Sequence, residues 1–80
     1  MTRDDVIAVI KKHIKENLDD ANVDDLDFDR SMKDYGANSL DVIEIVSCSM
    51  RDLKIKVPRN ELDNIQTINQ LVEVFLKHAA

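Results

Sequence analysis

One serine in this 80-residue chain stands where its side chain could do chemistry. Ser39 follows Gly36-Ala37-Asn38, and that glycine is the only one in the chain. Glycine adopts left-handed backbone conformations without strain, so it can turn the chain sharply just before a helix begins. We expect Ser39 on the first turn of that helix, with an exposed hydroxyl. Free amide groups and the positive end of the helix dipole would favour a phosphate nearby.

Other nucleophilic arrangements are less favoured by the residues around them. A hydrolase triad of Ser39 with His13 or His78 would need a Gly-x-Ser-x-Gly turn, which the chain lacks. Both histidines lie in charged helical segments, which indicates solvated surface residues. Cys48 is the only cysteine and lies between two serines, which is typical of a small packed residue. A catalytic pocket walled in on several sides would also be hard to build in 80 residues, so we predict that the protein is not an enzyme, with an enzyme that uses Ser39 as its nucleophile kept as a rival.

An acidic segment has the spacing that opens a calcium-binding loop. In Asp25-x-Asp27-x-Asp29, acidic residues alternate with other residues. A calcium loop also needs glycine at its sixth position and glutamate at its twelfth, and here those positions hold Arg30 and Gly36. The segment is better interpreted as a solvated acidic loop, so no metal site is predicted.

The overall charge limits the classes of partner. The chain has 11 Lys and Arg against 16 Asp and Glu, which gives a formal net charge of −5. Nucleic-acid phosphates would repel such a protein, so we expect no nucleic-acid partner. The single cysteine allows no internal disulfide and no thiol-based metal cluster. No secretory signal or membrane-spanning run is apparent, so we expect a cytoplasmic protein without a membrane partner.

The apolar pattern around the serine predicts an all-α fold. Amphipathic helices are expected over residues 2–18, 39–53 and 67–78, with one helical turn over 59–64. A long loop over 19–38 joins the first two helices, and its scattered apolar residues indicate that it is pinned across the bundle. We predict one domain over the whole chain: a small four-helix bundle, with three main helices plus one short helix, and a long first loop.

The helix that begins at Ser39 is expected to be the most buried of the three. Asn38 is suited to cap it, and Asp41 stands three residues further on, as in a capping box. The apolar face is predicted to comprise Leu40, Ile43, Val46, Met50 and Leu53, widened by Val42 and Ile45.

The segment around the serine resembles the modification site of acyl carrier proteins. The residues that match are Gly36-Ala37-Asn38-Ser39-Leu40-Asp41, preceded by Ser31-Met32-Lys33-Asp34-Tyr35. The order of helices and loops is similar to that family across nearly all 80 residues. The resemblance implies 4′-phosphopantetheine, taken from coenzyme A, on Ser39. It also implies an acyl-carrier-like bundle that holds acyl groups as thioesters on this arm.

The resemblance also implies partners and the residues that meet them. A phosphopantetheinyl transferase would attach the arm, and an acyltransferase, a ketosynthase or related enzymes would then use the carrier, which is expected to be a monomer. Asn38 and Leu40 would lie beside the arm, and Asp41 and Glu44 would face partner enzymes.

Two features depart from the family pattern. Asn38 occupies a position that is commonly Asp in the family, which removes a charge that partner enzymes often contact. Housekeeping fatty-acid carriers have a run of acidic residues late in the second helix, whereas this chain has four cations there. These cations are Arg51, Lys54, Lys56 and Arg59.

The cations affect both the expected pathway and the expected partner surface. A basic fatty-acid synthesis enzyme would meet a less favourable field at this helix end. The chain therefore looks more like a discrete carrier of a polyketide or mixed polyketide and nonribosomal peptide pathway. Arg51, Lys54 and Arg59 are candidate partner contacts, although each could simply be solvated. A fatty-acid carrier and a helical interaction adaptor without a prosthetic group remain as alternatives.

Overall fold

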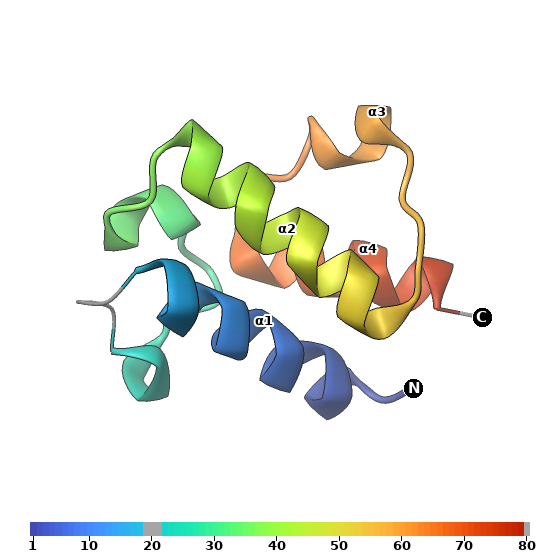
Figure 1. The fold of residues 1–80 in the computed structure, drawn as a ribbon, viewed down its shortest axis with the longest axis horizontal. Coiled ribbons are helices and arrows are strands. Elements are labelled where there is room, and N and C mark those ends of the chain that lie inside the picture. The colour runs from blue at the N-terminus through green and yellow to red at the C-terminus, as the bar shows by residue number, and fades with distance from the viewer. Residues whose placement is uncertain (19–21, 80) are drawn as a thin grey trace.

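The computed structural model describes residues 1–18 and 22–79, and all regular elements within those residues are helices (Figure 1). The predicted all-α fold is therefore confirmed. The helices are α1 (Arg3–Asn17), α2 (Ser39–Leu53), α3 (Arg59–Leu62) and α4 (Ile68–His78), and the connection from α1 to α2 holds the 3₁₀ helices η1 (Val23–Asp25) and η2 (Met32–Tyr35).

The three long helices begin where the sequence predicts, because each starts with a reciprocal capping box. In each box, the side chain of the residue just before the helix accepts a hydrogen bond from the backbone amide of the residue three positions later. The side chain of that later residue accepts a hydrogen bond from the backbone amide of the first residue. The pairs are Thr2 with Asp5 before α1, Asn38 with Asp41 before α2, and Thr67 with Gln70 before α4.

The core lies between the three long helices and is almost entirely aliphatic. The prediction that α2 is the most buried helix is wrong. Four side chains of the shorter α4 are at most 1% exposed, whereas α2 has only two side chains below that level, Ile45 and Ser49. The buried apolar residues are Val6, Ile10, Ile14, Leu18, Met32, Ala37, Ile45, Val46, Val57, Ile68, Leu71, Val72 and Phe75.

The predicted apolar face of α2 is also wrong at its N-terminal end. Leu40 is 75% exposed and Ile43 is 55% exposed. The buried stripe is instead centred on Ile45, Val46 and Ser49. Because Ser49 is polar, the apolar pattern did not include it in the buried face. The predicted face therefore included residues that are exposed to solvent. Exposed large apolar residues are therefore placed beside the start of α2.

His13 contradicts the expectation that both histidines are solvated. Its residue is 6% exposed, and its Nε2 lies 2.7 Å from Asp52 Oδ2 across the contact between α1 and α2. Its Nδ1 lies 3.4 Å from a Glu16 oxygen. His78 is partly buried and is paired with Glu61 of α3. His13 thus connects α1 to α2, and His78 connects α4 to α3.

The bond to His13 makes Asp52 a source of pH dependence. Hydrogen bonding from His13, assisted by Lys12, lowers the pKa of Asp52 below its ordinary value of 3.8. A carboxyl group whose pKa is lowered on folding stabilises the folded state at pH values above its ordinary pKa. That contribution is lost as the pH falls through the lowered pKa. The folded protein is therefore expected to lose stability in acid partly through this carboxylate.

We expect Asp52→Asn to flatten the acid side of the stability profile. Denaturant unfolding measured from about pH 6 down to about pH 3 should show a larger loss of stability in the parent protein than in the variant. The matched control is Asp63→Asn, because Asp63 is exposed and forms no ion pair within the described part of the chain. Equal slopes for the parent and the Asp52 variant would contradict the role of this carboxylate.

The predicted loop over 19–38 is pinned to the bundle, although its residues 19–21 lie outside the described residues. Met32 and Ala37 are buried, and four other apolar residues of the loop pack against the core. The carbonyls of Phe28 and Arg30 accept hydrogen bonds from the amides of Asn69 and Ile68 at the start of α4. The two 3₁₀ helices were not predicted, because three or four residues are too few to show a periodic pattern.

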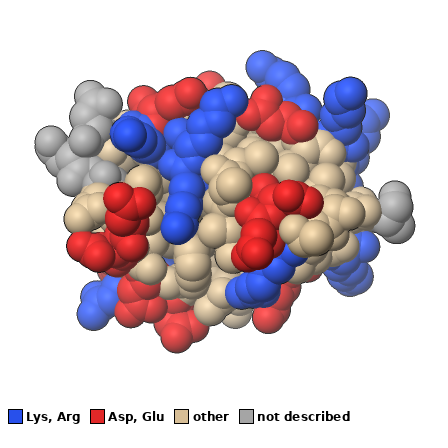
Figure 2. Space-filling model, turned by 90° about the horizontal axis from the view of Figure 1, so that it is seen from below, with Lys and Arg blue, Asp and Glu red and all other residues tan. Residues whose placement is uncertain are grey.

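The described residues give no sign of a membrane span or a metal centre. Within them, no helix combines the length and apolar character needed to cross a membrane, and no group of acidic, histidine and cysteine side chains is arranged to hold a metal ion. On the face shown in Figure 2, cationic and acidic side chains are interspersed instead of gathering in one patch of a single sign.

Candidate functional site

Ser39 is the first residue of α2 and its side chain is exposed, as predicted. The hydroxyl has no hydrogen-bond partner among the described residues. Leu40 beside it is also exposed, while Ala37 just before it is buried. The chain is thus anchored on one side of the serine and open to solvent on the other.

The capping box of α2 leaves two backbone donors at the serine. Asn38 Oδ1 accepts from the Asp41 amide at 2.8 Å, and an Asp41 carboxylate oxygen accepts from the Asn38 amide at 3.1 Å. The amides of Ser39 and Leu40 have no acceptor in the described structure. A helix N-terminus with free amides favours an anionic group, which is the chemistry expected for a phosphate ester at this hydroxyl.

Gly36 makes the turn that presents the serine. Its φ of 96° and ψ of 4° lie in the left-handed region, and its amide donates to the Lys33 carbonyl at 3.2 Å. A Cβ placed on Gly36 would meet nothing within 4 Å, so glycine is needed here for its backbone conformation and not for space. η2, which precedes this glycine, is held by the buried Met32 and by Tyr35, whose hydroxyl accepts from the Asp27 amide at 2.6 Å.

The predicted partner residues fall into two groups at opposite ends of α2. Asn38, Leu40, Asp41 and Glu44 lie within the first turns beside Ser39. Arg51 lies in the last turn of α2, Lys54 is its left-handed C-cap, and Arg59 begins α3. Twelve residues separate Ser39 from Arg51, which is about 18 Å along a helix. The structure therefore does not bring the cations to the serine, and α2 is acidic at one end and basic at the other.

Cys48 lies on α2 but is not prepared for nucleophilic chemistry. Its Sγ donates to a Glu44 carboxylate oxygen at 3.4 Å. This hydrogen bond, together with desolvation, raises the pKa of the Cys48 thiol. Less thiolate is then present at neutral pH, and the thiolate is the reactive form.

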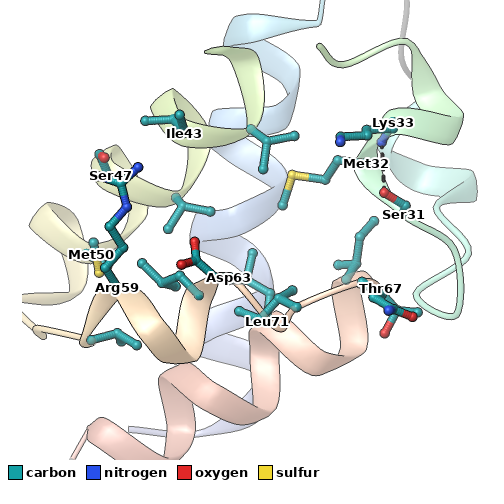
Figure 3. A pocket seen from close by; sticks show the side chains of 17 residues that line it. Ser31, Met32, Lys33, Ile43, Ser47, Met50, Arg59, Asp63, Thr67 and Leu71 are labelled. Carbon is teal, nitrogen blue, oxygen red and sulfur yellow. Dashed lines mark hydrogen bonds between the residues drawn. The ribbon is translucent and has the colours of Figure 1, made fainter. Parts of the chain in front are cut away.

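A cavity of about 490 Å³ opens beside α2, and nothing in the sequence pattern had indicated it (Figure 3). It lies between α2, α3, the start of α4 and η2, and it begins one turn beyond Ser39, at Val42 and Ile43. Ile43, which lines the cavity, is 55% exposed, and this exposure is a property of the folded chain. The apolar lining residues are Met32, Val42, Ile43, Val46, Met50, Val57, Leu62, Ile65, Ile68 and Leu71.

Comparison with known proteins places this arrangement in one family. The family profile described as "Phosphopantetheine attachment site" matches residues 8–75. The chain is 30% identical over 74 residues to the polyketide biosynthesis acyl-carrier-protein AcpK of Bacillus subtilis (strain 168), which covers 92% of this chain and 90% of that protein. It is 26% identical over 70 residues to an acyl carrier protein of Clostridium perfringens (strain SM101 / Type A), which covers 86% of this chain and 91% of that protein. No solved structure gave a significant match.

The chain belongs to the phosphopantetheine-attachment family, and its relatives identify it as an acyl carrier protein. The resemblance found in the sequence is thereby confirmed, as is 4′-phosphopantetheine as the covalent group of this family. Members of this class are non-catalytic carriers that serve the enzymes of a pathway. The residues present fit the group, because an exposed hydroxyl stands beside two free amides at a helix N-terminus.

Proposed function

We propose that Ser39 carries the phosphopantetheine arm of this acyl carrier. The observation that supports this most directly is the exposed hydroxyl at the first position of α2, reached through the left-handed turn at Gly36. When bound, the arm supplies a terminal thiol that holds the acyl group as a thioester. The protein itself positions the arm, because the buried Ala37 and Met32 fix the loop from which the serine projects.

The cavity beside α2 gives an attached chain an apolar environment. It begins one helical turn from Ser39 and is lined mainly by aliphatic side chains. Burying apolar surface is favourable by roughly 25 cal/mol per Å², so an aliphatic chain entering the cavity would be held more strongly than one left in water. The carrier would then protect its acyl group as well as position it.

We place the protein in polyketide or mixed polyketide and nonribosomal peptide biosynthesis, with fatty-acid synthesis as the second candidate. The basic end of α2 supports the first pathway, and so does the similarity to the carrier AcpK, whose name assigns it to polyketide biosynthesis. The similarity to acyl carrier proteins of Clostridium perfringens leaves the fatty-acid role open. Phosphopantetheinyl transferase and acyl-transferring or condensing enzymes are the partners of either role.

One loading assay separates the carrier from the other candidate functions. The purified protein is incubated with coenzyme A and a broad-specificity phosphopantetheinyl transferase, and its intact mass is measured. A single added phosphopantetheine is the expected result. No addition would favour a helical adaptor without a prosthetic group, and turnover of an acyl ester by the unmodified protein would favour an enzyme.

We further propose that the basic end of α2 contacts partner enzymes. Replacing Arg51, Lys54 and Arg59 together by Glu is expected to slow acyl transfer to or from the cognate enzyme about tenfold or more, because it places like charges opposite the acidic surface that such docking requires of the partner. Leu40, Asp41 and Glu44 near Ser39 would form the other half of the contact.

The measurement for this prediction is the acyl-transfer rate at low and high salt. The difference between the parent and the triple variant should shrink as salt rises, since salt screens exposed charges. Reversing Lys15 to Glu is the control, because Lys15 is an exposed cation on α1. Unchanged transfer rates in the triple variant would reject the basic surface as a docking site.

A further inference from the structure

Two cations stand at the cavity among its mainly aliphatic lining. Lys33 lines it from η2 and Arg59 lines it from α3, and both residues are exposed. Neither forms an ion pair among residues 1–18 and 22–79. Asp63 is the one anionic residue of the lining, so the cations outnumber the anion at this site.

Arg59 lies at the rim of the cavity, because it is both a lining residue and exposed. Its side chain extends from α3 toward Ser47 on α2, and both residues line the cavity (Figure 3). Ser47 lies eight residues beyond Ser39, which is about 12 Å along the helix. A group tethered at Ser39 and directed along α2 would pass Ile43 and then meet the guanidinium. The phosphate of the arm, which must stay at Ser39, would not reach it.

We infer that Arg59 binds a carboxylate on the acyl chain that the arm carries, so that this carrier distinguishes acyl groups with a free carboxyl group from those without one. This inference rests on the proposed attachment at Ser39. An apolar acyl chain gains no hydrogen bond or ion pair from a cation at the rim. The aliphatic lining of the cavity is sufficient to bind such a chain. A guanidinium presents a fork of donors that fits a carboxylate, and hydrogen bonds between ionised groups are roughly twice as strong as neutral ones.

The experiment compares acyl groups that have equal carbon counts and differ in the terminal carboxyl group. The transferase loads the protein with malonyl-, propionyl-, succinyl- or butyryl-phosphopantetheine from the matching coenzyme A thioesters, and intact mass confirms each product. Thermal unfolding of each product is then measured. We expect malonyl and succinyl forms to unfold about 4 °C above their propionyl and butyryl counterparts, the size of shift typical for one good interaction in a domain of this size.

Matched variants show whether the rim of the cavity causes the difference in unfolding temperature between the carboxylated and the plain acyl forms. Arg59→Gln should remove most of the difference. Asp63→Asn should enlarge it, because an anion of the lining that repels the carboxylate is removed. Arg51→Gln is the control, since Arg51 is an exposed cation of α2 that does not line the cavity, and it should leave the difference unchanged.

The outcomes separate this inference from the function on which it rests. Failure to load any acyl group, seen by intact mass, would count against attachment at Ser39 and not against the rim. Successful loading with equal unfolding temperatures for carboxylated and plain acyl groups would overturn the inference. An equal loss in the Arg51 and Arg59 variants would also overturn it, because the effect would then come from the general charge of the region.

Discussion

Ser39→Ala is expected to accept no phosphopantetheine at all, while remaining folded. The side chain is exposed and makes no hydrogen bond within the described structure, so its removal leaves no buried group unsatisfied. Alanine is also a good helix former at the first turn. We therefore expect loading to be abolished. The unfolding free energy should change by no more than about 0.5 kcal/mol, as for other surface substitutions.

Ser47→Ala is the matched control for this prediction. Ser47 is another serine of α2, two turns further along the same helix, and it lacks the helix N-terminus and the turn at Gly36. It should load like the parent protein in the same intact-mass assay. A Ser39 variant that still gains the full mass would show that another residue receives the arm.

Phe75→Ala is expected to have the largest effect on stability. Phe75 is fully buried and is the largest side chain of the core. Replacing a buried phenylalanine by alanine costs about 3–5 kcal/mol, through lost burial and the cavity that remains. A domain of 80 residues is stable by only about 4–12 kcal/mol, so this one change removes a large part of the total. Denaturant unfolding at neutral pH measures the loss.

Leu40→Ala is the matched control for the core variant. Both substitutions remove a large apolar side chain from a helix, but Leu40 is 75% exposed. Its loss should change the unfolding free energy by no more than about 0.5 kcal/mol. A cost similar to that of Phe75→Ala would mean that the N-terminal face of α2 is packed, contrary to the structure.

Features with a local cause could be predicted from the sequence. The capping box of Asn38 with Asp41 depends on residues three apart, and it appears where it was expected. The left-handed turn at Gly36 has the same local origin, because few residues other than glycine adopt that backbone conformation readily. The exposed serine follows from both features, which is why its position at the start of α2 could be predicted before the fold was known.

Features that depend on packing between helices could not be predicted in this way. The face of α2 was misassigned at Leu40 and Ile43, because the buried Ser49 is not apolar and gave no signal. His13 was expected at the surface, since its charged sequence neighbours do not reveal the contact with Asp52 across the helices. The cavity could not be predicted from the sequence either, because its lining comes from four separate segments of the chain.

The most direct test is to find the atom that bears the arm. The parent protein is loaded from coenzyme A and digested, and tandem mass spectrometry of the peptide containing residues 34–41 locates the added group. The group should be on the oxygen of Ser39, the one serine among residues 34–41, in a single copy per chain. An arm on any other residue, or a peptide left unmodified by a transferase that loads a known carrier alongside, would contradict the account.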